Sequence, residues 1–305
     1  MTTESGKMKI ADIYGPGKFG LSFELFPPKT EESERELFHN LDDLVAFEPD
    51  YITCTYGAGG STREKTLDIV SRVKERYKTP VAAHLTCVGA TKDDIRAFLR
   101  EATERDVDAI MALRGDPPKG ETEFKPVDGG LNYANELVEL IRDEFPHFGI
   151  AVAGYPEVHQ EAPDAIADLD NLKRKVDAGA EVVVTQFFFD NENFFRFREW
   201  CETAGINVPI VPGVLPVTNS KMIKRIAKLC GAQLPQDFLD RLEAHEDDPQ
   251  GQFDVGVYYA TRQVDELVES GVPGVHFYVL NKSKATATLL RALTLPQRAA
   301  DLAEG

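Results

Sequence analysis

A glutamate inside an apolar stretch, Ser22–Thr30, is the first residue of this chain whose placement suggests chemistry. Phe23, Leu25 and Phe26 favour a strand, and the two prolines that follow cannot donate a backbone N–H to a sheet. Glu24 is therefore expected near the carboxyl end of an apolar strand, where burial favours the protonated form of a carboxyl group. Proton transfer is the chemistry that such a group can perform. Taken alone, the pattern also fits an edge-strand glutamate that faces water.

Polar and titratable residues also follow the other apolar runs of the chain. These residues are Thr55, His84, Arg114 with Asp116, Tyr155 with His159, Gln186, and Tyr278. Several of them also fit a purely structural role: His84 could be a hydrogen-bonded core histidine, and Asp116 could form a turn before Pro117. Gln186 is harder to explain structurally, because an amide within so apolar a strand needs a hydrogen-bond partner.

The sequence offers little support for a metal site, a Ser-His-Asp arrangement or a Schiff-base lysine. The residues at the strand ends include only one firm histidine, so no metal site is expected. No Gly-x-Ser-x-Gly elbow is present for a Ser-His-Asp arrangement. A Schiff-base lysine is expected near a strand end, and only Lys282 lies close to one.

The elements that must position these residues alternate regularly. The predicted strands are the run before Pro27, Tyr51–Tyr56, Pro80–Thr86, Ala109–Leu113, Ile150–Ala153, Val182–Phe187, Pro209–Pro212 and Val275–Tyr278. Helices between them end at Ala178-Gly179, Ala204-Gly205 and Ser270-Gly271, shortly before the next strand. Eight such strands predict an α/β fold, a (β/α)8 TIM barrel, as one domain over 1–305 with its core at about 20–295. An open doubly wound sheet is less favoured, because no G-x-G-x-x-G follows the first strand.

The composition argues against a nucleic-acid-binding, membrane-spanning or secreted protein. The formal charge of −17 argues against a nucleic-acid partner. No apolar run approaches the ~20 residues that span a bilayer. The N-terminus lacks a secretory pattern, and the cysteines at 54, 87, 201 and 230 form no C-x-x-C pair. We therefore expect a cytoplasmic protein with reduced thiols, no membrane partner and local cations for any anionic ligand.

An ordered set of motifs resembles the methylenetetrahydrofolate reductase family. The matching blocks are Phe23–Thr30, Thr53–Ala58, Ala83–Cys87, Leu113–Asp116, Tyr155–His159, Leu172–Gly179, Thr185–Asp190, Pro212–Val217 and His276–Tyr278. Each block is weakly specific, but their order from about Gly20 to Lys282 is strongly so.

The resemblance implies a barrel that binds FAD and reduces 5,10-methylenetetrahydrofolate to 5-methyltetrahydrofolate, with NADH or NADPH as donor. It implies that Glu24 is the general acid that protonates a folate nitrogen. Asp116 matches an aspartate beside the flavin, and Gln186 an amide that binds folate. Nicotinamide and folate would use one face of FAD in turn, by ping-pong kinetics.

The resemblance also implies which residues contact the cofactor and the substrate. Those for the cofactor are Thr55, Tyr56, Ala58, His84, Arg114, Gly115, Asp116, Tyr133, Ala134, Tyr155, His159, Ala162, Asp168, Asn171, Arg174 and Lys175. Those for the substrate are Glu24, Thr55, Gln186, Tyr278 and Lys282. Arg114, Arg174 and Lys175 are the expected phosphate partners.

Two departures concern folate and nicotinamide binding. Ile226 stands where bacterial members often have phenylalanine, and Lys282 where arginine is common. No second, regulatory domain is expected after the last strand. The family forms homo-oligomers, and nothing in this pattern fixes an oligomeric state. A barrel lyase or transferase without a redox cofactor, and a non-catalytic flavin- or folate-binding protein, stay open as alternatives.

Overall fold

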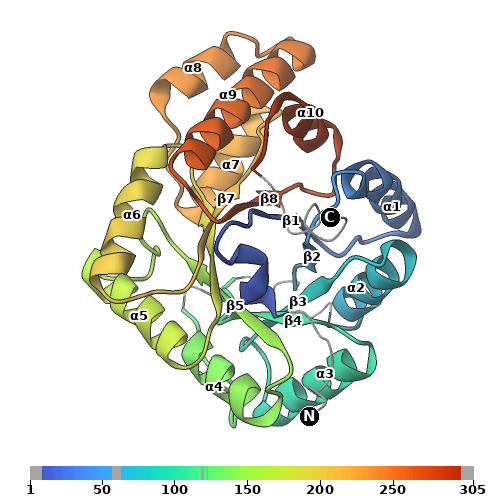
Figure 1. Cartoon of the computed structure of the whole chain (residues 1–305), viewed down its shortest axis with the longest axis vertical. Coiled ribbons are helices and arrows are strands. Elements are labelled where there is room, and N and C mark those ends of the chain that lie inside the picture. The colour runs from blue at the N-terminus through green and yellow to red at the C-terminus, as the bar shows by residue number, and fades with distance from the viewer. Residues whose placement is uncertain (1–8, 57–62, 118–119, 122, 297–305) are drawn as a thin grey trace.

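Eight parallel strands close into a barrel in the computed structural model, which describes residues 9–56, 63–117, 120–121 and 123–296. Each strand pairs with its neighbour in sequence, and β1 also pairs with β8, which closes the ring (Figure 1). The strands are β1 (Gly20–Leu25), β2 (Tyr51–Cys54), β3 (Val81–Thr86), β4 (Ala109–Leu113), β5 (Gly149–Gly154), β6 (Val182–Phe187), β7 (Ile210–Val214) and β8 (Gly274–Tyr278). The predicted (β/α)8 fold is confirmed.

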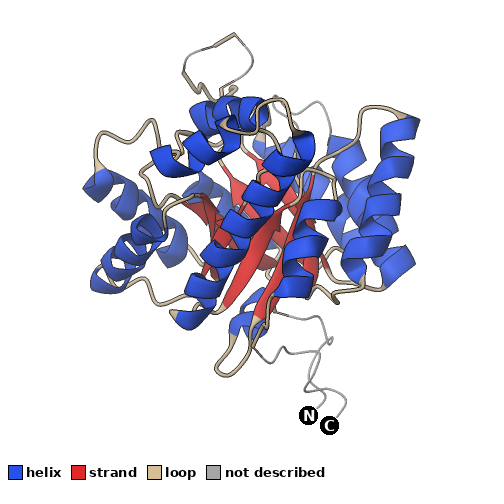
Figure 2. Ribbon diagram, turned by 90° about the horizontal axis from the view of Figure 1, so that it is seen from above, coloured by secondary structure: helices blue, strands red, loops and turns tan. Residues whose placement is uncertain are grey.

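Helices surround the barrel, so that in Figure 2 the strands lie enclosed by helical layers. They are α1 (Glu31–Val45), α2 (Arg63–Tyr77), α3 (Lys92–Glu104), α4 (Ala134–Glu144), α5 (Ala165–Asp177), α6 (Asn191–Thr203), α7 (Ser220–Cys230), α8 (Gln236–Glu243), α9 (Pro249–Glu269) and α10 (Lys284–Ala292). Because helices cover the outside and side chains fill the inside, most strand residues are buried.

Local sequence explains where helices begin and end. Thr30 caps α1 through a reciprocal pair with Ser33, and three glutamates occupy its first turn. Gly179, Gly205 and Gly271 follow α5, α6 and α9 with φ of 116°, 71° and 75°. These are the left-handed positions that glycine adopts without strain, so the predicted helix ends are confirmed.

Other boundaries differ from the predictions. β2 ends at Cys54 rather than Tyr56, because Thr55 and Tyr56 leave the ladder to enter the loop above it. The seventh strand is shifted to Ile210–Val214. A short 3₁₀ helix, η1 (Ile10–Tyr14), was not predicted, and its apolar side chains pack into the barrel interior. The β7–β8 connection also carries α7 and α8 in addition to α9.

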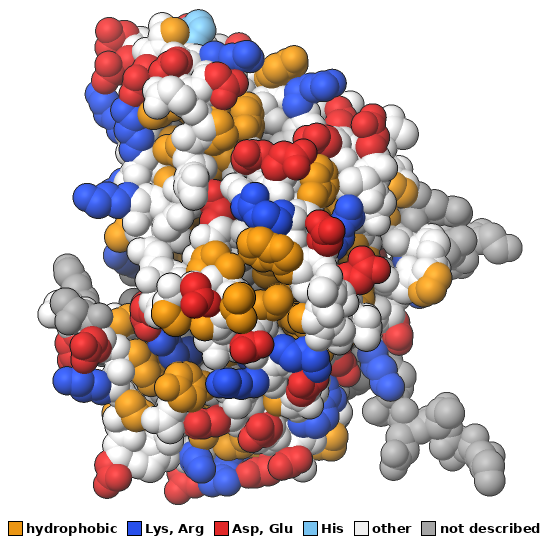
Figure 3. Space-filling view, turned by 90° about the vertical axis from the view of Figure 1, so that its left-hand side faces the viewer, with side chains coloured by type: hydrophobic (Ala, Val, Ile, Leu, Met, Phe, Trp, Pro, Cys, Tyr) orange, Lys and Arg blue, Asp and Glu red, His pale blue; other side chains and the backbone are white. Residues whose placement is uncertain are grey.

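The outer surface mixes the two signs of charge. On the face shown in Figure 3, acidic and basic side chains are interspersed rather than gathered into separate patches. Among the helices of the described ranges, none combines the length and apolar composition needed to cross a membrane. All four cysteines are unpaired thiols, as predicted.

Candidate active site

A cavity of about 830 Å³ opens at the carboxyl ends of the strands. Every strand or the loop directly after it contributes to the lining, from Glu24 on β1 to Tyr278 on β8. This is the end of a TIM barrel where active sites are built, and the volume lies within the ~300–1,000 Å³ typical of ligand sites.

The predicted site residues converge on this cavity. Those that line it are Glu24, Thr55, Tyr56, His84, Arg114, Gly115, Asp116, Tyr133, Ala134, Tyr155, His159, Ala162, Asp168, Asn171, Arg174, Lys175, Gln186 and Tyr278. Ala58 lies outside the described residues. Ile226 also contributes to the lining, from α7, so the departure from the common phenylalanine is at the cavity wall.

Lys282 is an exception, because it does not line the cavity. The turn after β8 has two residues with positive φ, Leu280 at 49° and Asn281 at 55°. The Asn281 side chain accepts from the backbone N–H of Phe26 at 3.0 Å and donates to its carbonyl oxygen at 2.8 Å. This clamp leaves Leu280 in the cavity lining and Lys282 exposed beyond it. Lys282 therefore does not line this cavity, and its expected contact with the substrate stays a prediction.

One side of the cavity, which we name the acid wall, consists of Glu24, Thr55, His84 and Tyr278. The Glu24 side chain is 17% exposed, and its Oε2 lies 3.4 Å from Nε2 of His84. The same oxygen lies 3.7 Å from Nε2 of the buried His276. Burial lowers the pKa of His84, against the opposing effect of the Glu24 charge, so a neutral imidazole faces the carboxyl group.

Tyr278 bridges β8 and β6 across this wall. Its hydroxyl donates to the Thr185 carbonyl oxygen at 2.7 Å. The ring passes over Gly213 on β7, where a Cβ atom would lie 2.6 Å from Tyr278 Cε2 and 2.3 Å from the Thr185 oxygen. Glycine is needed here for close approach, not for backbone conformation. Next to Thr185, the Gln186 Oε1 accepts from the Phe187 N–H at 3.0 Å, which leaves its NH₂ group to serve a ligand.

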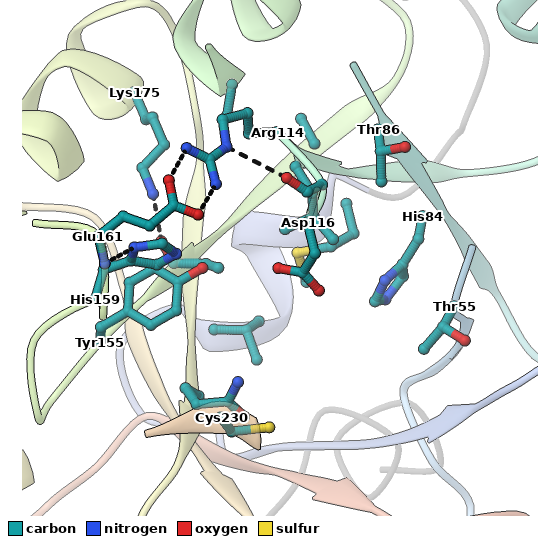
Figure 4. A pocket seen from close by; sticks show the side chains of 18 of the residues that line it. Thr55, His84, Thr86, Arg114, Asp116, Tyr155, His159, Glu161, Lys175 and Cys230 are labelled. Atoms are coloured by element: carbon teal, nitrogen blue, oxygen red, sulfur yellow. Dashed lines mark hydrogen bonds and ion pairs between the residues drawn. The ribbon is translucent and has the colours of Figure 1, made fainter. Parts of the chain in front are cut away.

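The opposite side, which we name the cation wall, carries Arg114 and Lys175, with the ring of His159 beside them (Figure 4). Burial lowers the pKa of His159, so its ring is neutral. Arg174, next to Lys175 on α5, also lines the cavity. Burial lowers the pKa of Lys175 to about 8, partly offset by the Asp168 carboxylate. The Lys175 ammonium donates to the Ala153 carbonyl oxygen at 2.6 Å. Asp168 in turn accepts from the His159 backbone N–H at 3.0 Å, so α5 and the loop after β5 hold each other in place.

Arg114 is already paired. Its guanidinium makes a two-pronged contact with Glu161, at 2.6 and 2.7 Å, and this contact lowers the pKa of Glu161. Glu161 lines the cavity but was not predicted, because nothing in the sequence links it to an arginine 47 positions away. An acidic residue in a loop otherwise supplying His159 and Ala162 was the only available signal.

Asp116 lies between the two walls, and Figure 4 shows it flanked by His84 and Thr86 on one side and Tyr155 on the other. The preceding Gly115 has φ of 89°, and a Cβ there would lie 2.8 Å from Val88 Cγ1. The Asp116 charge also contributes to raising the pKa of Tyr155, after the larger effect of burial. Within the described ranges, no three His, Cys, Asp or Glu side chains are grouped as metal ligands.

Fold and cavity together define a class: a (β/α)8 barrel with an enzyme-type site at its carboxyl end, in which a largely buried carboxyl group and a group of basic side chains line one cavity. The comparisons then give the family. A model described as methylenetetrahydrofolate reductase matches residues 9–294. The chain belongs to the methylenetetrahydrofolate reductase family.

Bacterial and plant proteins are among its relatives. The 5,10-methylenetetrahydrofolate reductase of Escherichia coli (strain K12) is 42% identical over 277 residues, 91% of each chain. The Salmonella typhimurium protein of the same name is 42% identical over 290 residues, 95% of each chain. Methylenetetrahydrofolate reductase (NADH) 1 of Arabidopsis thaliana is 38% identical over 94% of this chain and 50% of the plant protein.

A solved structure supports the fold alone. It is an uncharacterised Clostridium thermocellum protein described as binding two copies of 5-methyl-5,6,7,8-tetrahydrofolic acid. The TM-score is 0.59 at 18% identity, over 90% of this chain and 94% of the other.

Proposed function

We propose that the chain is a single FAD-binding catalytic domain that reduces 5,10-methylenetetrahydrofolate to 5-methyltetrahydrofolate, with NADH or NADPH as donor. The observation that carries this proposal is the placing of the acid wall and the cation wall in one cavity. The names of the relatives support a folate substrate, and the Arabidopsis name specifies NADH for that protein.

The residues of the cavity suit FAD. A dinucleotide needs an extended site with cations for its two phosphates, and the 830 Å³ cavity runs from the acid wall to Arg174 and Lys175 on α5. Arg114 is neutralised by Glu161, so Arg174 and Lys175 would meet the phosphates first. His84 Nε2 and Thr86 Oγ1 are buried without a hydrogen-bond partner among the described residues, and both residues line the cavity, where a bound group would satisfy them.

The chemistry that bound FAD would supply is hydride transfer from the reduced nicotinamide to the one-carbon unit of the folate. The chain itself would handle the proton. Glu24 would donate its carboxyl proton to a ring nitrogen of the folate, breaking that nitrogen's bond to the methylene carbon. The carbon becomes an iminium cation and accepts the hydride, so one proton and one hydride convert methylene to methyl.

Two further side chains would assist. The Asp116 carboxylate would stabilise the cationic one-carbon unit electrostatically, because opposite charges attract strongly in a partly enclosed site. The free NH₂ group of Gln186 would hold the folate beside Glu24. Both residues line the same cavity as Glu24, so one bound folate could contact all three.

One titration tests the proposal. The purified protein, incubated with FAD and desalted, should keep a flavin absorption spectrum. Anaerobic NADH or NADPH should bleach that spectrum, and 5,10-methylenetetrahydrofolate should restore it. A protein that retains no flavin contradicts the proposal in favour of a lyase or transferase. A spectrum that never bleaches indicates a binding protein.

A further inference from the structure

The interior of the barrel is divided into an apolar half and a polar half. The inward positions of β4 to β7 below the cavity are filled by Ala109, Met111, Ala151, Val182, Val184 and Val211. The inward positions of β1, β2, β3 and β8 are mostly polar, with Ala82 on β3 as an apolar exception; the polar side chains are Ser22, Glu24, Tyr51, Thr53, His84 and His276. Packed barrel interiors are usually filled by branched apolar side chains, and a buried polar group costs free energy unless it is paired. The burial of these polar side chains therefore needs a functional explanation.

Three of these side chains, Tyr51, Ser22 and His276, lie together with the buried Tyr14 of η1, and we name these four residues the interior column. The strand register places Ser22 beside both Tyr51 and His276. The Tyr14 hydroxyl donates to the Tyr51 hydroxyl at 2.9 Å, and the Tyr51 ring is stacked with the His276 ring, their centroids 6.5 Å apart. Ser22 Oγ then lies 2.8 Å from Nδ1 of His276. The interior column thus runs from η1 to the residue behind Glu24.

The interior column constrains the His276 ring. The Ser22 hydroxyl has one proton, and donating it to Nδ1 of His276 gives this buried pair a complete hydrogen bond. In a neutral imidazole the other nitrogen then carries the hydrogen. That nitrogen, Nε2, is buried without a hydrogen-bond partner among the described residues and lies 3.7 Å from Oε2 of Glu24.

Both neighbouring imidazoles face the same carboxyl oxygen. Nε2 of His84 lies 3.4 Å from Glu24 Oε2, and Nε2 of His276 lies 3.7 Å from it. We propose that His276, oriented by the Ser22 hydroxyl and the Tyr51 ring, is a positioning residue that engages Oε2, so that the transferable proton of Glu24 resides on Oε1. This inference rests on the proposed role of Glu24 as the general acid.

Magnetic resonance of the flavin-free protein tests the orientation directly. Histidine labelled with ¹⁵N should show His276 with its hydrogen on Nε2, the resonance being identified by its loss in His276→Gln. Ser22→Ala should convert this signal to a mixture of tautomers, whereas the matched Thr53→Val variant should not. Thr53 is also buried and inward-facing, but its hydroxyl has no hydrogen-bond partner among the described residues. A hydrogen on Nδ1 in the unmodified protein overturns the inference.

Rapid mixing of the flavin-loaded protein tests the consequence. Ser22→Ala and His276→Gln should each slow flavin reoxidation by 5,10-methylenetetrahydrofolate about tenfold, with flavin reduction by NADH or NADPH changed less than twofold. Because His276 acts through Glu24, adding His276→Gln to Glu24→Gln should change reoxidation less than twofold further.

The outcomes separate the two proposals. Additive effects in the double variant, or equal slowing of both half-reactions, would overturn the positioning role while leaving Glu24 as the acid. An unchanged reoxidation rate in Glu24→Gln would overturn the acid role itself, and the inference with it. Should His276→Gln fail to fold, Ser22→Ala removes only a hydroxyl and carries the same test.

Discussion

The two walls of the cavity differ in how their charged groups are compensated. On the acid wall, the Glu24 carboxyl group faces two imidazole nitrogens at 3.4 and 3.7 Å, beyond an ordinary hydrogen bond. On the cation wall, Arg114 is fully engaged by Glu161, and Lys175 donates to a backbone carbonyl oxygen. The Glu24 carboxyl group of the acid wall thus contacts its imidazole neighbours only at long distances, whereas Arg114 and Lys175 of the cation wall have close hydrogen-bond partners.

Under the proposed function, this difference corresponds to a division of tasks. A carboxyl group that must release and recover a proton is served by neighbours that do not lock one protonation state. Cations that hold a phosphate-containing cofactor through many turnovers are better fixed in advance, because preorganisation reduces the cost of binding. We therefore expect substitutions on the acid wall to change folate turnover, and substitutions on the cation wall to change cofactor affinity.

The largest effect should come from the acid wall. In Glu24→Gln, flavin reoxidation by methylenetetrahydrofolate should slow by about 10²–10⁴-fold, the usual range for loss of a general acid. Flavin reduction by the nicotinamide should survive within about threefold in anaerobic stopped-flow experiments, since that step needs no proton from Glu24. Glu157→Gln is a matched control, because Glu157 is half-buried but does not line the cavity. Equal loss of both half-reactions would remove Glu24 from the acid role.

The next effect should come from the cation wall. Lys175→Met should raise the Kd for FAD about 10- to 100-fold at pH 7, as expected for a charged hydrogen bond worth ~1.5–3 kcal/mol. Flavin fluorescence titration measures this, with Lys173→Met as the control, because Lys173 pairs with Asp177 on the outer surface of the same helix. An unchanged Kd would show that Lys175 does not contact the cofactor.

The pH dependence of FAD binding offers a finer test of the same wall. The pKa of Lys175 is lowered to about 8, so its positive charge is complete below that pH and is lost as the pH rises through it. FAD affinity should therefore fall between pH 7 and 9, by up to about tenfold per pH unit above 8. Lys175→Met should bind FAD with little change over this range, and a parallel fall in both proteins would assign the effect elsewhere.

Asp116 lies between the two walls, so its substitution tests whether this residue acts in folate reduction or in FAD binding. Asp116→Asn should slow the folate half-reaction about tenfold, or about 1.4 kcal/mol of transition-state stabilisation, with FAD retained. Asp170→Asn, an exposed change on α5, serves as the control. Unchanged folate kinetics would contradict the electrostatic role, and loss of FAD would place Asp116 with the cation wall.

The smallest effect should come from releasing Arg114. Glu161→Gln removes its anionic partner and should lower the Kd for FAD about two- to fivefold, because the arginine charge becomes available to the phosphates. Equilibrium dialysis at two ionic strengths measures this, and added salt should diminish the gain. Weaker binding would mean instead that Glu161 orients Arg114 for the cofactor.

Much of the fold could be predicted from the sequence, because strands buried on both faces read as continuous apolar runs and glycines mark the helix ends. η1 could not, since Ile10, Ile13 and Tyr14 acquire a partner only once the barrel interior exists. The end of β2 was placed two residues late, because Thr55 and Tyr56 are as strand-prone as the residues before them. Strand propensity does not show where a ladder stops.

The candidate site was predictable as far as topology determines it. Parallel strands bring their carboxyl ends together, so polar residues after each apolar run converge. Contacts that depend on side-chain reach were not predictable. Glu161 meets Arg114, and Lys282 stays outside because Asn281 clamps the preceding turn. Only one feature of the sequence pointed to His276 and Ser22: both are polar residues at inward-facing positions of otherwise apolar strands.

The contact between Ser22 and His276 has a consequence for biosynthesis. The two residues are 254 positions apart, and they meet only where the last strand seals against the first. Until β8 has been synthesised and inserted, β1 presents an open edge and Glu24 lacks one of its two imidazole neighbours. Loop closure over so long a span is slow relative to local folding, so this corner of the barrel is the last to mature. A nascent chain would therefore complete most of its architecture before Glu24, the proposed acid, has both of its imidazole neighbours.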